Sequence, residues 1–327
     1  MKTLITGGAG FIGSNFIHYW SGKYPQDEII NLDVLTYAGN LENLGDLAEN
    51  GNYKFIKADI AKEEDVSQII KEERPDLIIN FAAETHVDRS ILGPDEFIRT
   101  NINGTYNLLK AAKENGNIRF HHISTDEVFG TLQRNDPAFN EKSAYDPRSP
   151  YSASKAASDH LVRSFFHTFD LPVTISNCSN NYGPYQFPEK VIPLFVTNLI
   201  DGLKVPLYGN GGNIRDWIHV DDHNAGIEAI LQRGQIGETY CLGGDHEVSN
   251  LELTKKLLQL LNKDDSYIEP VTDRLGHDWR YAIDFSKATR DLDWQPTISF
   301  DEGLQATVRW YQDHPEWWRP LKEKISK

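Results

Sequence analysis

The chain has 327 residues, of which 39% are hydrophobic and 25% charged, and its formal net charge is -15. This composition is typical of a soluble globular protein, and the length suits one large domain or two of ordinary size. The acidic balance argues against nucleic acid or an anionic membrane as a partner, because both require a basic face. It leaves room for an anionic small ligand in a locally basic pocket.

Cysteine usage and hydropathy indicate a reduced cytoplasmic setting. Cys178 and Cys241 are too few for a disulfide framework, and they lack the spacing of metal ligands. There is no signal-peptide pattern, and no apolar run approaches the roughly 18 residues that a membrane span requires. We therefore expect a cytoplasmic protein without a metal site and without a membrane partner.

A glycine-rich turn follows the first predicted strand, residues 2–6, and opens a helix over about 14–23. Such glycines permit a tight turn and close approach of the backbone to a pyrophosphate, and the helix amides then face the phosphates. The turn contains two overlapping spacings, Gly7-Gly10-Gly13 and Gly8-Gly10-Gly13.

The second predicted strand, residues 28–32, ends at Asp33. An acid at this distance after the glycine turn is expected to bind the ribose 2′-hydroxyl, which favours NAD over NADP. The alternative is an ordinary glycine turn and a surface aspartate. The order strand, glycine turn, helix, strand and acid favours the NAD site.

Alternating strands and helices continue, with strands at 53–57, 76–81 and 172–177 and a helix at 94–113. The alternation predicts an α/β protein with a doubly wound parallel sheet of the Rossmann type. Right-handed crossovers place all strand ends at one edge of that sheet.

Beyond residue 177 the pattern loosens into shorter pieces interrupted by prolines. We expect an NAD-binding domain over 1–177, rejoined by segments at about 214–243, and a smaller, interleaved mixed lobe over 178–327 that binds the substrate. The expected elements are helices at 191–201, 221–233, 250–261 and 300–313, strands at 205–208, 216–220 and 239–242, and a loop at 273–281.

Tyr151 and Lys155 are four residues apart at the start of a predicted helix, so they share one face. A free phenol titrates near pH ~10, and a neighbouring ammonium lowers that pKa. Ser124 or Thr125, at the end of the preceding strand, could hydrogen-bond the same substrate oxygen. Together with a hydride acceptor, this arrangement predicts oxidation of an alcohol; alone, it is typical of a solvated helix face.

Asp126 and Glu127 follow that strand directly. Strand alternation would send their side chains to opposite faces, as in an exposed acidic turn. A bend after the strand would direct both toward one ligand. The sequence leaves these two interpretations open.

Six segments resemble the extended short-chain dehydrogenase/reductases and, among them, the dTDP-glucose 4,6-dehydratase family. The resemblance covers essentially the whole chain. The segments are residues 6–13, 82–90, 124–130, 151–155, 180–190 and 273–278. The adjacent Asp126 and Glu127 distinguish this family from the related sugar-nucleotide epimerases.

The resemblance implies a catalytic set of Thr125, Asp126, Glu127, Tyr151 and Lys155. Tyr151 would take the C4 hydroxyl proton of the sugar while hydride passes to NAD, with Lys155 holding the nicotinamide ribose and Thr125 the C4 oxygen. Glu127 would then remove the C5 proton, and protonated Asp126 would donate to the departing C6 hydroxyl. Two adjacent carboxyl groups with different tasks must have separated pKa values.

The resemblance also implies two sets of ligand contacts. The cofactor set is Gly7, Gly10, Phe11, Ile12, Gly13, Asp33, Asp59, Ile60, Phe81, Ala82, Ala83, Thr100, Ser124, Tyr151, Lys155 and Asn180. The substrate set is Thr85, His86, Asn180, Lys190, Pro206, Tyr208, Arg215, Asn250, Arg274, His277 and Tyr281. In the substrate set, Arg215 and Arg274 are the candidates for bidentate contacts with the diphosphate of dTDP-glucose.

Two other functions stay open at this point. One is a UDP-sugar 4-epimerase or decarboxylase of the same superfamily, and the other is a non-catalytic NAD-binding regulator. The resemblance further implies a homodimer built from the helices near Asn101 and Lys155.

Overall fold

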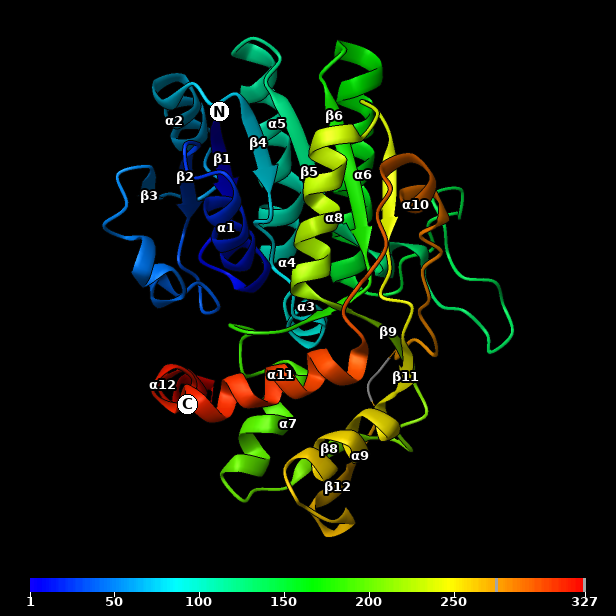
Figure 1. Ribbon diagram of the computed structural model, residues 1–327. Helices are drawn as coiled ribbons and strands as arrows, with labels where there is room; N and C mark the ends of the chain where they lie inside the picture. The colour runs from blue at the N-terminus through cyan, green and yellow to red at the C-terminus, as the bar shows by residue number, and fades with distance from the viewer. Residues whose placement is uncertain (274–275, 326–327) are drawn as a thin grey trace.

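The computed structural model describes residues 1–273 and 276–325, which form two lobes (Figure 1). The larger lobe is built on a seven-stranded sheet in the order β10-β6-β5-β4-β1-β2-β3, and all neighbouring strands are parallel. Its strands are β1 (Lys2–Thr6), β2 (Glu28–Asp33), β3 (Tyr53–Lys57), β4 (Leu77–Asn80), β5 (Arg119–Thr125), β6 (Val173–Cys178) and β10 (Thr239–Leu242).

The chain winds outward from β1 in both directions, so the strand order reverses between β1 and β4. The predicted α/β fold with a doubly wound parallel sheet is therefore confirmed. In such sheets, ligands bind outside the carboxyl ends of the strands at the point of reversal. The glycine turn after β1 lies at that point.

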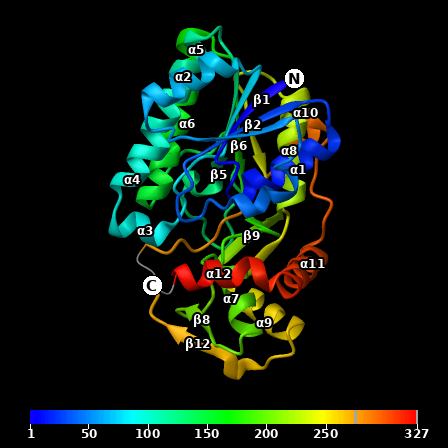
Figure 2. The ribbon, with the colours of Figure 1, turned by 90° about the vertical axis from the view of Figure 1, so that its left-hand side faces the viewer.

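Helices cover both faces of this sheet (Figures 1 and 2). On one face lie α1 (Phe11–Lys23) and α8 (Val220–Arg233), and on the other α2 (Glu63–Glu73), α5 (Thr105–Glu114) and α6 (Pro150–Phe169). Because both faces are covered, all four residues of β4 are buried. Helix α6 begins with a capping box, in which the Ser149 hydroxyl accepts from the Ser152 amide.

The predicted helix over 94–113 is continuous, since the backbone at its internal junctions (Phe97, Ile98, Gly104 and Thr105) is right-handed helical, but its middle is π-helical. The segment contains α4 (Asp95–Phe97), a π-helical stretch η2 (Ile98–Gly104) and α5, preceded by the short helix α3 (Val87–Leu92). The side chain of Asn101 in the π-helical stretch pairs with the Glu84 backbone, accepting from its amide at 2.8 Å and donating to its carbonyl at 3.0 Å. We attribute the π-helical stretch to this pairing, which the 3.6-residue pattern of a regular helix does not encode.

The smaller lobe has its own core around Tyr182, Phe195, Trp217 and Trp318. Two small sheets frame it, one of β7 (Asn180–Tyr182), β9 (Ile214–His219) and β11 (Glu247–Ser249), the other of β8 (Val205–Tyr208) and β12 (Ile268–Val271). The remaining helices are α7 (Val191–Ile200), α9 (Asn250–Leu260), α10 (Ser286–Leu292), α11 (Phe300–Asp313) and α12 (Pro315–Ile325), and the short turns are η1 (Leu41–Leu47), η3 (Asp126–Phe129) and η4 (Asp265–Tyr267).

The lobes are interleaved in sequence, because β9 pairs in the smaller lobe while α8 and β10 return to the large sheet. The division into an NAD-binding and a substrate-binding domain stays a prediction. Within 1–273 and 276–325, we find no helix with the length and apolar character that a membrane crossing demands.

Candidate active site

A cavity of about 310 Å³ opens at the carboxyl ends of the sheet strands. Every residue of the predicted cofactor set lines it, as do Thr125, Asp126 and Glu127. The fold thus gathers residues from the glycine turn, from the ends of β2, β3, β4, β5 and β6, and from the start of α6 around one space. Their roles toward a ligand stay predictions.

The glycine turn has no room for side chains. Gly7 has a φ of +70°, and a Cβ there would lie 2.6 Å from the Ala82 nitrogen. A Cβ on Gly13 would overlap the Gly7 carbonyl oxygen. Gly10 has an extended backbone and forms the N-cap, so α1 begins at Phe11 rather than near residue 14. The free amides of the first turn of α1 therefore adjoin the cavity, as a pyrophosphate would require.

Asp33 is buried at the end of β2 and lines the cavity beside this turn. Its carboxylate accepts from the Ala9 amide at 3.0 Å and from the Leu35 amide at 2.8 Å. Burial raises the pKa of Asp33, and the two amides counteract that rise. The carboxylate is thereby fixed in place as an acceptor, and the whole turn fits a dinucleotide.

The chain bends immediately after β5, where η3 begins at Asp126. The Thr125 hydroxyl caps this turn by accepting from the Glu127 amide at 3.2 Å. Because strand alternation ends there, both Asp126 and Glu127 reach the cavity. The bend thus removes the objection that alternation would separate the two carboxyl groups.

Asp126 is almost fully buried, and its Oδ2 has no hydrogen-bond partner among the described residues. Burial raises the pKa of Asp126 well above its ordinary value, and the negative charge of Glu127 raises it further. Burial and Glu127 therefore both favour the protonated form of Asp126. A protonated carboxyl group with an unpartnered oxygen is suited to donate a proton.

Tyr151 and Lys155 share one face of α6 as predicted from their spacing, but the predicted lowering of the tyrosine pKa is not found. Burial raises the pKa of Tyr151 well above its ordinary value, and Glu127 acts in the same direction. The Lys155 ammonium donates to the Ile123 carbonyl oxygen at 2.7 Å. The cause of the difference is desolvation beside carboxylates, which the i, i+4 spacing does not reveal.

The predicted substrate residues fall into two groups. Thr85, Asn180 and Lys190 line the cavity, and the Lys190 ammonium donates to the Thr85 carbonyl oxygen at 3.0 Å. The second group lies outside the lining: His86 before α3, Pro206 and Tyr208 on β8, Arg215 on β9, Asn250 at the start of α9, and His277 and Tyr281 in the chain before α10. Arg274 lies outside the described residues.

Arg215 and Tyr281 adjoin the catalytic carboxyl groups even though they do not line the cavity. The Arg215 guanidinium lies 4.3 Å from the centre of the Tyr281 ring. The charge of Arg215 lowers the pKa of Asp126, and the charge of Glu127 raises the pKa of Tyr281. The charges of Arg215 and of the catalytic carboxyl groups therefore influence one another. Tyr208 and His277 form a separate ring pair, with centroids 6.2 Å apart.

Sequence reasoning missed several lining residues, notably Tyr37, Arg99 and Glu189. Arg99 forms an ion pair with Asp59 at 2.6 Å. Tyr37 and Glu189 are connected through the side chain of Arg89. The Arg89 guanidinium lies 3.6 Å from the Tyr37 ring centre and 3.2 Å from a Glu189 oxygen. The position of Glu189 beside Lys190 was a usable signal, whereas Tyr37 lies in a loop without a motif.

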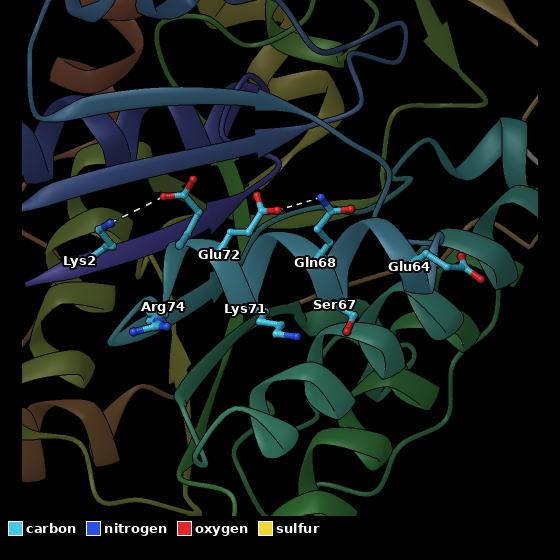
Figure 3. Close-up of a pocket in the computed structure, with 8 residues that line it drawn as sticks. Lys2, Glu64, Ser67, Gln68, Lys71, Glu72 and Arg74 are labelled. Atoms are coloured by element: carbon cyan, nitrogen blue, oxygen red, sulfur yellow. Dashed lines mark hydrogen bonds and ion pairs between the residues drawn. The ribbon is translucent and has the colours of Figure 1, made fainter.

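A second hollow, of about 950 Å³, lies along α2, far from the catalytic carboxyl groups (Figure 3). The side chains around it pair with each other: Lys2 lies 3.7 Å from Glu73, and Gln68 donates to Glu72 at 2.8 Å. Lys2 is the first residue of β1, so the hollow adjoins the amino end of that strand. We interpret it as a solvated helix face and assign it no function.

With this geometry in hand, comparison with known proteins gives a consistent result. The family model described as GDP-mannose 4,6 dehydratase matches residues 4–307. The dTDP-glucose 4,6-dehydratase of Salmonella typhimurium is 48% identical, over 98% of this chain and 96% of its own length. That of Mycobacterium tuberculosis is 48% identical, over 99% and 97%. The chain belongs to the dTDP-glucose 4,6-dehydratase family.

Solved structures agree with membership of this family. The dTDP-glucose 4,6-dehydratase DesIV of Streptomyces venezuelae, solved with NAD and TYD bound, matches with a TM-score of 0.95 and 48% identity, over 98% of this chain and 100% of that one. The UDP-glucose 4-epimerase of Thermotoga maritima matches with a TM-score of 0.88 and 29% identity, over 96% and 99%. The fold is thus shared with epimerases, while the sequence is much closer to the dehydratases.

Proposed function

We propose that the protein is an NAD-dependent dTDP-glucose 4,6-dehydratase. It converts dTDP-D-glucose to dTDP-4-keto-6-deoxy-D-glucose by oxidation at C4, elimination of water across C5 and C6, and reduction at C6. The observation that carries the proposal is the placement of Asp126, Glu127 and Tyr151 in the cavity that also holds the glycine turn. The names and identities of the relatives support the same activity.

NAD is the cofactor, and when bound it supplies the acceptor and the donor of hydride. The turn from Gly7 to Gly13 would hold its pyrophosphate, because its tight backbone, which leaves no room for a Cβ at Gly7 or Gly13, brings the first amides of α1 to the cavity. Asp33 would accept from the ribose hydroxyls. The related dehydratase DesIV, solved with NAD bound, supports this choice.

The protons of the reaction are handled by three side chains. Tyr151 accepts the proton of the C4 hydroxyl, with Thr125 hydrogen-bonded to the same oxygen. Glu127 removes the C5 proton, which a 4-ketone makes acidic. Asp126, kept protonated by burial and by Glu127, donates to the departing C6 oxygen so that it leaves as water.

Lys155 provides the positive charge that Tyr151 needs as a base. In the structure, the phenol is neutral because it is buried beside Glu127. An ammonium in this low-dielectric site favours the phenolate, and it would also bind the nicotinamide ribose. Lys155 has three N–H donors, of which the Ile123 carbonyl takes one.

The diphosphate of the substrate needs cations in an otherwise acidic protein. Arg215 is buried near Asp126, and Lys190 lines the cavity, so these two are the described cations we assign to the nucleotide half. Arg274 and His277 come from the segment before α10. The remaining assigned contacts are Thr85, His86, Asn180, Pro206, Tyr208, Asn250 and Tyr281.

A 4-epimerase of the same superfamily is the second candidate, favoured by the TM-score of 0.88 to the Thermotoga maritima enzyme. Epimerisation at C4 requires the tyrosine, the lysine and NAD, but no proton transfer at C5 or C6. It leaves Asp126 and Glu127 without a task. A decarboxylase or a non-catalytic NAD-binding regulator leaves the same residues unexplained.

The protein assembles as a homodimer through the helices at one side of the large lobe. Apolar side chains are exposed there on α3, η2, α5 and α6, and Figure 2 shows α3, α5 and α6 together at that side. They are Ile91, Leu92, Ile98, Tyr106 and Phe169, and Leu92 is 88% exposed. Ile91 and Leu92 are neighbours on α3, and exposed apolar side chains that gather on a surface mark association sites. Light scattering should give a dimer mass for the wild type and a monomer mass for Leu92→Glu.

The protein acts in the cytoplasm, where its two cysteines stay reduced. Cys178 and Cys241 are both buried and unpaired. Burial raises the pKa of Cys178 to about 12, so its thiol is neutral. Because neither cysteine forms a disulfide, a reducing compartment would break no covalent link at these positions.

The decisive test is incubation of the purified protein with dTDP-glucose in deuterated water, without added NAD. A 4-keto-6-deoxy product carrying deuterium at C5 supports elimination with a resident cofactor. A C4 epimer of the substrate would identify an epimerase instead. Absence of turnover with NAD and several sugar nucleotides supplied would contradict both enzymatic functions and would favour the non-catalytic NAD-binding regulator.

A further inference from the structure

A buried polar cluster lies one helical turn beyond Lys155, around Asp159 of α6. The Asp159 side chain is fully buried. Its Oδ2 accepts three hydrogen bonds, from the Ser124 hydroxyl at 2.9 Å, the Tyr145 hydroxyl at 2.8 Å and the Asn177 amide at 3.3 Å. Its Oδ1 has no hydrogen-bond partner among the described residues. The catalytic steps proposed above do not use this carboxylate.

Asp159 Oδ1 and the Lys155 ammonium both face His122. The His122 Nε2 lies 3.5 Å from Asp159 Oδ1 and 3.5 Å from Lys155 Nζ. The other ring nitrogen, Nδ1, faces the Asn80 amide nitrogen at 3.2 Å, because the Asn80 oxygen already accepts from Thr6. Nδ1 is therefore an acceptor, and the proton of the neutral ring is on Nε2.

The protonated Nε2 of His122 cannot accept a hydrogen bond from Lys155. Burial and the charge of Lys155 hold the pKa of His122 well below its ordinary value, so the ring stays neutral. Among the described residues, the buried Lys155 ammonium therefore donates to the Ile123 carbonyl oxygen, and the imidazole neither accepts a hydrogen bond from it nor balances its charge. An ammonium buried in this way requires a negative charge nearby.

Asp159 is the group that supplies this charge. Titratable or charged groups face the site from several elements: His121 and His122 on β5, Cys178 on β6, Tyr145 before α6, and Tyr151, Asp159 and Arg163 on α6. Burial lowers the pKa of Lys155 to about 8, and Asp159 opposes that effect more strongly than Cys178 does. The thiol is neutral. Burial raises the pKa of Asp159, while the charge of Lys155 and the hydrogen bonds from Tyr145 and Ser124 oppose that rise and favour the carboxylate, so Asp159 remains as the counter-charge.

We propose that Asp159 is a positioning residue, whose carboxylate keeps Lys155 protonated and in place beside Tyr151 and the cofactor cavity. Ser124, Tyr145 and Asn177 fix the carboxylate from the other side by their hydrogen bonds to Oδ2. The inference rests on the proposed function, in which Lys155 acts as an ammonium.

Asp159→Asn tests the proposal, because it removes the charge and keeps the shape. Without the charge, Lys155 loses its proton at lower pH. We expect the alkaline limb of the kcat profile for dTDP-glucose to move down by about one pH unit, a tenfold change in proton concentration, with activity recovered at lower pH. The alkaline limb of NADH binding, followed by NADH fluorescence, should move with it.

Arg163→Gln is the variant of opposite sign. The Arg163 guanidinium donates to the Tyr145 hydroxyl at 2.7 Å, and its positive charge opposes the rise that burial causes in the pKa of Asp159. Without this competing cation, the negative charge of Asp159 acts on Lys155 alone. The alkaline limbs of kcat and of NADH binding should therefore move to higher pH, by less than the Asp159→Asn shift. The Arg163 side chain is half-buried, and we expect the variant to fold.

Asp222→Asn is the matched control, because Asp222 is another buried carboxylate with three donors, in α8. It should lower the melting temperature and leave both limbs unchanged. Limbs of Asp159→Asn that coincide with the wild type, or a loss that is equal at every pH, would overturn the proposal. If Asp159→Asn does not fold by circular dichroism, an unmoved or lowered limb in Arg163→Gln overturns it instead.

The two proposals fail in different ways in this experiment. Absence of turnover of dTDP-glucose by the wild type contradicts the proposed function. The pH dependence of NADH binding still reports the charge of Lys155 in that case. A wild type that turns over, with NADH-binding limbs that none of the variants moves, contradicts the role of Asp159 alone.

Discussion

The two ends of the cavity are built by different means. The cofactor end is formed mainly by backbone: glycines without room for a Cβ and the free amides of α1. Its one charged side chain, the Asp33 carboxylate, is fixed by two backbone amides. At the catalytic end, it offers side chains whose protonation depends on burial, above all Asp126 and Tyr151. The first end is sensitive to volume and the second to charge. Substitutions that change only one of these properties should therefore affect only one end.

Asp126→Asn should produce the largest effect, because it removes a proton donor and leaves the volume unchanged. We expect dehydration to slow by roughly 10²–10⁴-fold, as for the loss of a general acid. Oxidation at C4 does not need this proton, so NADH should accumulate on the protein within one turnover and be visible by its fluorescence. Bound NAD content should equal that of the wild type. A variant that loses NAD as well would contradict the separation of the two ends.

Gly13→Val tests the cofactor end, where volume is decisive. The added Cβ would overlap the Gly7 carbonyl oxygen, so the turn must shift. We expect NAD content after purification to fall at least tenfold and overpacking to lower stability by about 1–3 kcal/mol.

Gly22→Ala, in the same helix, is the control for Gly13→Val. A Cβ at Gly22 meets nothing within 4 Å. This variant should keep NAD and gain about 0.5–1 kcal/mol of stability. Equal NAD losses in both variants would show that the helix, rather than the turn, is what matters.

The same contrast explains what could be predicted from the sequence. The glycine turn, Asp33 and the strand alternation are local patterns, and backbone geometry fixes their meaning, so the fold followed from them. The rest of the cofactor set came from the family resemblance, and its role stays a prediction. The bend at Asp126 and the π-helical stretch at Asn101 depend on hydrogen bonds formed only in the folded chain. The raised pKa of Tyr151 depends on desolvation, which no spacing encodes. Asp159 carries no motif, and its role follows from what lies around it.

Buried histidines beneath the catalytic end should make the protein sensitive to acid. Burial lowers the pKa of His121 and of His223 to about 3. The unfolded chain binds these protons near pH ~6.5, so the stability from the two neutral rings is complete above that pH and is lost as the pH falls below it. The expected slope is about 1.4 kcal/mol per pH unit for each ring. Urea unfolding between pH 7.5 and 5.5 measures it.

His223→Gln should remove one of these two contributions. Its Nδ1 lies 2.8 Å from the Asn181 amide oxygen, and glutamine can replace that contact without titrating. Below pH 6.5, the slope of the unfolding free energy against pH should be about 1.4 kcal/mol per pH unit smaller than in the wild type, which is the contribution of one proton. A slope that does not change would mean that His223 is not neutral in the folded protein.

Asp33→Ser should produce the smallest effect, and it tests whether charge matters at the cofactor end at all. Serine keeps a short polar side chain but removes the negative charge that would meet the ribose hydroxyls. We expect NAD affinity to fall roughly tenfold, the worth of a charged hydrogen bond, and NADP to bind better than it does to the wild type. Isothermal titration with each cofactor measures both. The kcat at saturating NAD should change little, because Asp33 lies away from the catalytic carboxyl groups. A large fall in kcat would mean that charge at one end of the cavity is felt at the other, and the division between volume and charge would then fail.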